Sequence, residues 1–443
     1  MGYEKEIMKY VDKVKSMCIE NDTISDELFK KYGVYRGLRD QNGKGVLTGL
    51  TNISKIISFK EENGERVPCD GELWYRGYRI ESLIAETRDN YGFENTAYLL
   101  LFGRKPSEEE LAEFCKILAD ARSLPTNFTR DVIMKAPTKD IMNSMTRSIL
   151  TLSSYDKNLN SADVENSIRQ CIQLISTFPM LAIYGYHAYN HYENDESMYI
   201  HRPNRKLSTA QNLLSMLRAD KKYTDVEAKV LDIALMLHME HGGGNNSTFT
   251  TRVVTSSGSD TYSAMAAAMS SLKGPRHGGA NIKVMEMIQD IKKNVKDTDD
   301  KDELKSYLTK ILAGEAFDGK GLIYGMGHAV YSLSDPRERI FKRYVEELAM
   351  SKGADKDMRL YNSIEEIAPE IIAAKRKIFK GVSPNVDFYS GFVYEMLGIP
   401  KELYTPLFAI ARVVGWSAHR IEELIGMGKI IRPAYLSVME ELE

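Results

Sequence analysis

Two histidines in glycine-rich turns are the side chains best placed for acid–base chemistry. His277 stands in the stretch Lys273–Asn281, between a Gly-Pro helix stop and a Gly-Gly pair, and His328 stands in the similar turn Gly325–Tyr331. Glycine frees the backbone and removes side-chain bulk, so each turn leaves room for a ligand beside the imidazole. Such turns also let backbone N–H groups approach phosphates or amides, although Gly-Met-Gly is not a dinucleotide-binding fingerprint. Either histidine, taken alone, is equally compatible with a structural role.

A second pair of histidines, His238 and His241, is expected in the last turn of one helix, where residues three apart share a face. The helix dipole favours positive side chains there, so helix capping or simple burial explains the pair as well as a binding role does. The pair lacks the HExxH spacing of zinc sites, and no third ligand is evident. We therefore expect no metal.

Three arginines and one aspartate complete the candidate residues. Arg337 falls in the first turn of an expected helix, where its charge opposes the helix dipole, so it is expected to have another partner. Arg412 lies in an otherwise apolar helix and must be paired, a structural ion pair being the plain alternative. Asp387 precedes a helix and is compatible with an N-cap or with a carboxylate tuned as a base. Arg432 is held extended by the following proline and by itself resembles an ordinary surface residue.

The composition excludes several classes of function. The chain has 443 residues, enough for two or three domains, and its 59 Lys and Arg nearly balance 62 Asp and Glu, for a net charge of -3. This balance gives no whole-chain attraction to nucleic acid or to acidic membranes. Four scattered cysteines without metal spacing favour a reduced cytoplasmic protein, and no apolar stretch is long enough to span a membrane. We expect a soluble, unprocessed protein.

The hydrophobic patterns predict a mainly helical fold with one small sheet. Residues 1–32 are expected to form one or two polar helices. Isoleucine-rich Ile53–Lys60, an Asn63-Gly64 turn and an extended segment to Tyr78 predict a β-hairpin or sheet near residues 53–78. From Ile80 onward the apolar residues recur at three- and four-residue steps, which is typical of helices. Capping signals predict helix starts after Thr224, at Pro336, after Asp387 and at Thr405-Pro406, and the first of these helices is expected to reach Gly242–Gly244.

The chain resembles the citrate synthases from about Gly49 to Tyr435. The resemblance rests on a set of motifs in the family's order, which together are far more specific than any one of them. These motifs are His238-Met-Glu-His241 with Gly-Gly-Gly-Asn-Asn, Gly274–Asn281, Gly325–Tyr331 with Asp335-Pro-Arg337, Asn385–Gly391, Ala411-Arg412 and Arg432-Pro433.

The resemblance implies a mainly α homodimer with a large helical domain, residues 1–278 and 387–443, and a small helical domain, residues 279–386. It also implies condensation of acetyl-CoA with oxaloacetate to citryl-CoA, followed by hydrolysis to citrate and CoA. Acetyl-CoA is then a co-substrate, and no permanently bound cofactor, metal, nucleic acid or membrane is expected. The alternative within the family is 2-methylcitrate synthase, which uses propionyl-CoA; one methylene discriminates by only about 1–3 kcal/mol in an apolar pocket.

Residue roles follow from the same resemblance. Asp387 would remove a proton from the acetyl methyl group, His277 would stabilise the enol, and His328 would polarise the oxaloacetate carbonyl. Four residues would bind the substrate carboxylates: His238, Arg337, Arg412 and, reaching in from the neighbouring subunit, Arg432. Backbone groups of one segment would line the CoA site: Leu322, Ile323, Tyr324, Gly325, Met326 and Gly327.

Two further expectations concern CoA and closure. Where family members often carry a basic residue, this chain has Ser332, Leu333 and Ser334, which leaves the CoA phosphates without an obvious partner. Gly278 and Gly279 fall at the expected domain boundary and are predicted to act as a hinge. A histidine-based metalloprotein is a competing class, which metal analysis tests. A catalytically dead helical oligomer is another, and the intact set His277, His328 and Asp387 argues against it.

Overall fold

The computed structural model describes residues 2–40, 45–87, 92–160, 163–327, 330–331, 333–376, 382–426 and 428–439. The chain forms two compact units, Met1–Leu50 and Thr51–Glu443. Each is described separately below. Every residue of the candidate site belongs to the second unit.

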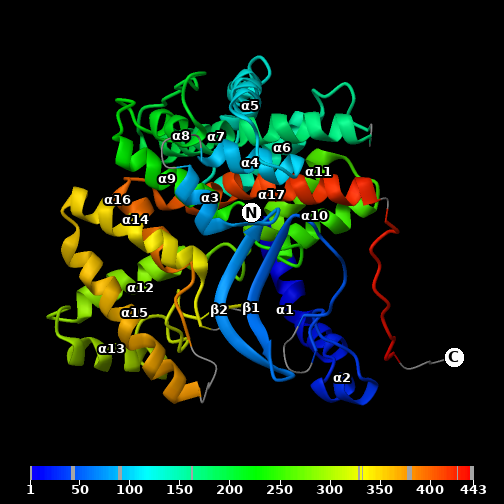
Figure 1. Cartoon of the computed structure of the whole chain (residues 1–443). Helices are drawn as coiled ribbons and strands as arrows, with labels where there is room; N and C mark the ends of the chain where they lie inside the picture. Colours follow the sequence, from blue (N-terminus) through cyan, green and yellow to red (C-terminus); the bar gives the residue numbers. More distant parts are fainter. Residues whose placement is uncertain are drawn as a thin grey trace. The chain divides into compact units, whose positions relative to one another are not determined.

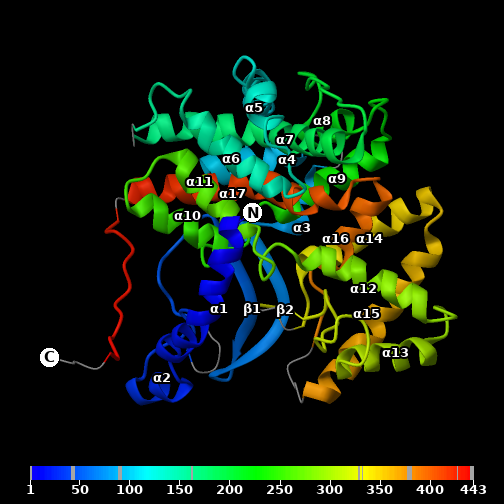
Figure 2. The same ribbon diagram turned by 180° about the vertical axis from the view of Figure 1, so that it is seen from behind.

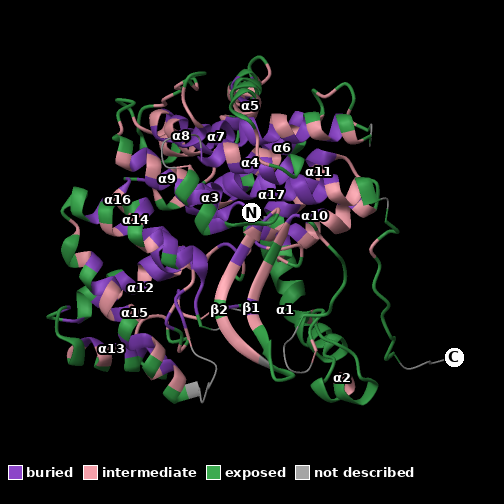
Figure 3. Cartoon of the chain, viewed as in Figure 1, coloured by how far each residue is buried: buried purple, intermediate pink, exposed green. Residues whose placement is uncertain are grey.

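The first unit holds the two polar helices expected from the sequence, α1 (Gly2–Asp22) and α2 (Asp26–Tyr32). Most of their described side chains are exposed, as the colouring of Figure 3 makes clear. Helix α2 ends at Gly33, whose φ of +62° is the left-handed conformation that glycine adopts without steric cost.

The predicted hairpin is confirmed as a three-stranded antiparallel sheet in the order β1-β2-β3, made of β1 (Ser54–Glu62), β2 (Glu65–Tyr75) and β3 (Tyr78–Arg79). The register pairs Ser54 with Tyr75 and Glu62 with Glu65. Both turn residues have positive φ, +54° at Asn63 and +81° at Gly64, as a type I′ hairpin turn requires. The sheet is the only one among the described residues.

Helices make up the rest of the second unit, as predicted. A first set precedes the candidate site: α3 (Ile80–Glu86), α4 (Gly92–Phe102), α5 (Glu108–Ala121), the π-helical turn η1 (Thr129–Ile133), α6 (Ile141–Ser153), α7 (Val164–Asn194) and α8 (Thr209–Leu217). A second set contributes to the site or supports it: α9 (Asp225–His238), α10 (Asn246–Ser256), α11 (Thr261–Leu272), α12 (Ala280–Asn294), α13 (Lys301–Ala313), α14 (Pro336–Lys352), α15 (Asp355–Arg376), α16 (Asp387–Met396), the 3₁₀ turn η2 (Lys401–Leu403) and α17 (Tyr404–Gly426).

Helix α17 runs through the core of this unit. It packs against α7, α10, α9, α4 and α11, and its residues Ala409–Ile421 are all buried. Figures 1 and 2 show it surrounded by these helices on both sides. A helix that is apolar on every face is stable only inside a protein, so the charged residues that α17 carries are enclosed with it.

Helices α12 to α16 gather at one side of the second unit (Figure 1). Helix α16 packs on α12 and α14, helix α15 packs on α13 and α14, and α14 also touches α9. The predicted division into domains 1–278 with 387–443 and 279–386 stays a prediction, as does the hinge at Gly278 and Gly279. Gly278 is nevertheless tightly packed, because a Cβ there would lie 2.4 Å from the Leu272 carbonyl oxygen.

The predicted helix starts are confirmed, and one predicted helix end is wrong. Thr224 caps α9 in a capping box with Glu227, and Asp335 caps α14 ahead of Pro336. Helix α9, however, ends at His238 and not at the glycine run, so His241 lies beyond it. The Glu240 side chain accepts a hydrogen bond from the Gly242 N–H (2.6 Å) and the Tyr75 hydroxyl bonds the Glu240 main chain, which together draw the backbone out of the helix.

No helix among the described residues has the length and apolar character needed to cross a bilayer.

Candidate active site

Two buried polar side chains, His238 and Arg412, share one aromatic surface. The His238 ring lies 4.5 Å from the ring of Phe408, and the Arg412 guanidinium carbon lies 4.7 Å from it. The Nε of Arg412 donates a hydrogen bond to the His238 carbonyl (2.7 Å). Nδ1 of His238 and Nη1 of Arg412 are enclosed without a hydrogen-bond partner among the described residues. Leaving a buried polar atom unpaired costs about 1–3 kcal/mol, so this pair is poised for a ligand.

Arg337 lies buried at the start of α14 and is ion-paired. Its Nη2 lies 2.7 Å from Oδ2 of Asp335 and its Nε lies 3.0 Å from Oδ1, a bidentate pair with the residue that also caps the helix. Burial opposes the charge, but Asp335 holds the pKa of Arg337 above its ordinary value. The expectation that Arg337 has another partner is confirmed. Arg412 differs, because no ion pair joins it to another described residue.

Asp387 is the first residue of α16 and does not cap it. The N-cap position belongs to Val386, which makes no side-chain cap hydrogen bond, and the Asp387 N–H donates to Oδ1 of Asn385 (3.0 Å). The N-cap alternative for Asp387 is therefore wrong. Burial raises the pKa of the Asp387 carboxyl to about 6, although Arg337 and Arg412 act in the opposite direction. A carboxylate with a raised pKa is a stronger base than an ordinary aspartate and is still ionised at neutral pH.

The glycine turn before His328 is tied by backbone hydrogen bonds to the segment before Asp387. The Gly327 N–H donates to the Ser383 carbonyl (2.7 Å), and the Asn385 N–H donates to the Gly325 carbonyl (2.9 Å). Gly325 has φ +80°, and a Cβ on it would lie 2.8 Å from Cδ2 of Phe388. The close approach of these two segments therefore requires glycine at this position.

His277 is held by Ser247 at the start of α10. The Ser247 N–H points at Nε2 of the imidazole (3.4 Å), and the Ser247 hydroxyl lies 3.0 Å from the same atom. A backbone N–H can only donate, so Nε2 offers its lone pair and the ring proton resides on Nδ1. Burial, and then Arg412, lower the pKa of His277 to about 4. The imidazole is therefore neutral at pH 7, with an N–H available at Nδ1.

The predicted residues of the described part largely converge. Burial, and then Arg337 and Arg412, lower the pKa of His238 far below its ordinary value, and Arg412 also acts on His277 and Asp387. Electrostatic influence of this kind falls off over about one Debye length, so these five side chains lie in one part of the second unit.

The remaining predicted residues have different outcomes. His328 and Ser332 fall outside the described residues. Arg432 is exposed in the segment 428–439, and no hydrogen bond or ion pair joins it to another described residue. Leu333 is exposed, whereas Ser334 is buried and bonds Asp70 and the Gly71 N–H of β2, so Ser334 is committed to joining β2 and is not free to meet a phosphate. The role of Leu322–Gly327 in CoA binding stays a prediction.

Three supporting residues were missed from the sequence: Phe408, Ser247 and the ion-pairing role of Asp335. Phe408 carries a signal, because it precedes Arg412 by one helical turn on the same face. The ion-pairing role of Asp335 also has a signal in the sequence, because an N-cap aspartate lies close to the side chain two residues later, here Arg337. Ser247 carries none, because it meets His277 only through the fold.

Comparison with known proteins identifies the family. The model of the citrate synthase C-terminal domain matches residues 39–434. The chain belongs to the citrate synthase family. It is accordingly a condensing enzyme, a transferase, with the mainly α fold that the motifs predicted.

Relatives carry two names. The citrate synthase of Synechocystis sp. is 35% identical over 370 residues, which cover 83% of this chain and 85% of that protein. The 2-methylcitrate synthase 1 of Corynebacterium glutamicum is 32% identical over 402 residues, covering 89% and 94%. Among solved structures, the Thermoplasma acidophilum citrate synthase in ternary complex with carboxymethyl coenzyme A and oxaloacetate superposes with a TM-score of 0.74 at 26% identity, covering 90% of this chain and 96% of that one.

The site contains no arrangement typical of a metal centre in the part of the chain that the structure describes, where no three His, Cys, Asp or Glu side chains cluster suitably. The described residues can carry out general acid–base catalysis with a neutral imidazole and a carboxylate, next to guanidinium groups that can bind carboxylates.

Proposed function

We propose that the chain condenses acetyl-CoA with oxaloacetate and hydrolyses the resulting citryl-CoA to citrate and CoA. One observation carries the proposal: among the described residues, the buried Nδ1 of His238 and Nη1 of Arg412 have no hydrogen-bond partner, and a second buried arginine, Arg337, acts electrostatically on both groups. Cationic and polar groups enclosed in this way call for a small anion with two carboxylates.

Oxaloacetate would be bound by these residues before the acyl-CoA reacts. Arg412 would turn its unpaired Nη1 to one carboxylate, while Nδ1 of the neutral His238 would hydrogen-bond the substrate. Arg337 would contact the second carboxylate from the bidentate pair with Asp335, which fixes the guanidinium in one orientation. Arg432 of a neighbouring subunit would complete the site, in a homodimer.

Asp387 and His277 would then convert acetyl-CoA into its enol, which is the nucleophile of the reaction. Asp387 would take a proton from the acetyl methyl group, while Nδ1–H of His277 would donate to the thioester oxygen and stabilise the enol. A carboxyl group whose pKa is raised to about 6 suits the first step, and a neutral imidazole fixed by Ser247 suits the second. The enol carbon would attack the keto carbon of oxaloacetate, His328 would supply the proton to the carbonyl oxygen, and water would cleave the thioester.

The second candidate is 2-methylcitrate synthesis from propionyl-CoA, and relatives with that name favour it. The chemistry is the same, and only the space for one additional methylene distinguishes the two. Thiol release from acetyl-CoA and from propionyl-CoA, each with oxaloacetate, tests the choice. We expect a higher kcat/KM with acetyl-CoA; a clear preference for propionyl-CoA would select the second candidate, and no thiol release from either would refute both.

A further inference from the structure

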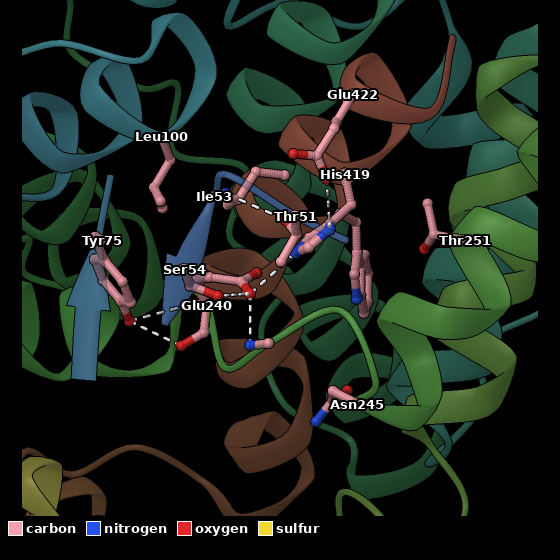
Figure 4. Close-up of polar contacts among 12 residues, drawn as sticks. Thr51, Ile53, Ser54, Tyr75, Leu100, Glu240, Asn245, Thr251, His419 and Glu422 are labelled. Carbon is pink, nitrogen blue, oxygen red and sulfur yellow. Dashed lines mark hydrogen bonds and ion pairs between the residues drawn. The ribbon is translucent and has the colours of Figure 1, made fainter. Parts of the chain in front are cut away.

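Glu240 is a fully enclosed carboxylate in the loop that follows His238. Its Oε1 accepts three hydrogen bonds: from the Ser54 hydroxyl (2.8 Å), from the Gly242 N–H (2.6 Å) and from Nε2 of His419 (3.0 Å). Figure 4 shows these contacts converging on one oxygen. Burial opposes ionisation, but His419 and Arg412 hold the pKa of Glu240 at about 2, so the group is an anion at any physiological pH.

The main chain of Glu240 is fixed as well. The Tyr75 hydroxyl on β2 lies 2.9 Å from the Glu240 carbonyl and accepts from the Glu240 N–H at 3.3 Å. The residue therefore joins β1 through Ser54, β2 through Tyr75, the glycine loop through Gly242 and α17 through His419. Charge-assisted hydrogen bonds of this kind are about twice as strong as neutral ones, so the loop is held firmly.

The loop begins directly after one member of the ligand-binding pair, His238 at the end of α9, and lies against α17, which carries the other member, Arg412. His238 lies two residues before Glu240, and its carbonyl receives the Arg412 Nε hydrogen bond. Arg412 and His419 are two helical turns apart on α17 and therefore share one face. Between them, a Cβ on Gly415 would lie 2.5 Å from Oε2 of Glu240, so the carboxylate packs directly against the α17 backbone.

The contacts of Glu240 are structural. Its Oε1 is occupied by three donors, and its Oε2 is enclosed against Gly415 without a hydrogen-bond partner among the described residues. Its position can still affect the reaction, because moving the loop relative to α17 changes the distance between His238 and the guanidinium of Arg412.

We propose that Glu240 is a positioning residue for oxaloacetate, holding the loop after His238 against β1 and α17 so that His238 and Arg412 present their unpaired nitrogens together. The inference rests on the proposed function, since it assigns oxaloacetate to this pair. It adds a residue that contacts no substrate.

The test compares Glu240→Gln with Glu227→Gln in the full-length protein. Gln keeps an acceptor oxygen and the size of Glu but loses the charge, which weakens all three hydrogen bonds. We expect the KM for oxaloacetate to rise by about tenfold, with kcat and the KM for acetyl-CoA changed by less than about threefold. Glu227 is a matched control, because it is also buried, pairs with Arg218 and Lys352, and lies in the first turn of α9, whereas Glu240 follows the end of that helix. Its variant should lose thermal stability and keep the wild-type KM.

A second variant, Ser54→Ala, removes one donor to Oε1 without changing any charge. We expect it to raise the KM for oxaloacetate by a few fold, in the same direction as Glu240→Gln. If Glu240 acted only through its charge, its neutralisation would make the pocket more positive and lower the KM, and Ser54→Ala would have no effect. Either result overturns the proposal, as does a Glu240→Gln enzyme that loses stability but keeps its KM.

Oxaloacetate binding measured by calorimetry distinguishes this proposal from the proposed function. A wild-type protein that binds oxaloacetate without releasing thiol from either acyl-CoA refutes the reaction, and the two variants are then compared by Kd in place of KM. A wild-type protein that does not bind oxaloacetate refutes both. If the wild type turns over and both variants keep the wild-type KM for oxaloacetate, only the role of Glu240 is refuted.

Discussion

Replacing Asp387 by Asn should abolish condensation and at the same time stabilise the fold at neutral pH. The carboxyl is in the first turn of α16, and burial raises its pKa to about 6, against an ordinary value of 3.8. A raised carboxyl pKa means that the native structure disfavours the charged form. The folded protein is therefore less stable whenever this carboxyl group is ionised.

The size of that cost follows from the shift. Each pKa unit corresponds to about 1.4 kcal/mol, so the full shift corresponds to a cost of about 3 kcal/mol for a carboxylate without solvent screening. Asp387 keeps part of its surface accessible to solvent, which screens the charge, so we expect about 1–2 kcal/mol. For a protein of this length, this is a rise in Tm on the order of 2 °C.

The stability contribution of Asp387 changes with pH in a direction that follows from its raised pKa. In the unfolded chain the carboxyl ionises near its ordinary pKa, whereas in the folded protein it ionises near 6. Between these values the native state binds more protons, so this group's contribution to stability falls as the pH rises. The difference in Tm between Asp387→Asn and the wild type should therefore be small near pH 4, about half its full value near pH 5, and constant above about pH 7.

Differential scanning fluorimetry across this pH range, together with thiol release, measures both effects. Asp387→Ser is a useful companion, since it also removes the charge but is smaller than Asn. If Asp387→Asn lowers Tm at pH 8, or if the difference in Tm is the same at pH 5 and pH 8, the carboxylate is not destabilised by burial. If condensation continues at nearly the wild-type rate, Asp387 is not the base.

Three further outcomes are expected. Ser247→Ala should lower kcat by about tenfold with little change in the KM for oxaloacetate, because it loosens His277 without touching the dicarboxylate site; an unchanged kcat would contradict the assigned role. Gly325→Ala should lower both Tm and kcat, because the new Cβ meets Phe388 at 2.8 Å and the residue has φ +80°, and a variant with wild-type Tm would show that the turn relaxes freely. Dialysis against a chelator should leave thiol release unchanged, whereas activity lost on chelation and restored by a metal would revive the metalloprotein hypothesis.

Much of the fold was predictable because local chemistry and tertiary structure agree. The Asn63-Gly64 turn needs two residues with positive φ, and asparagine and glycine adopt positive φ readily. These two residues were therefore enough to predict the hairpin. Asp335 followed by Pro336 marked the start of α14 for the same kind of reason. The end of α9 was missed because it is decided by Tyr75 and Glu240, whose contacts join residues far apart in the chain.

In the candidate site, too, features set by local sequence were predictable, whereas features set by tertiary packing were not. The helix position of Arg337 indicated an anionic partner, because a cation opposes the dipole there, and the structure supplies Asp335. The stacking of His238 and Arg412 on Phe408 depends on how α9 and α17 pack, and no sequence period encodes the distance between two helices. The same holds for Ser247 beside His277.

The backbone hydrogen bonds between the Gly325–Gly327 turn and residues 383–385 have a consequence for evolution. Main-chain atoms join the two segments at Gly325, Gly327, Ser383 and the Asn385 N–H, so these hydrogen bonds do not depend on the side chains of Met326 and Ser383. A lineage can exchange those two side chains without losing these hydrogen bonds. The two positions can therefore vary while the glycine turn stays joined to the segment before Asp387.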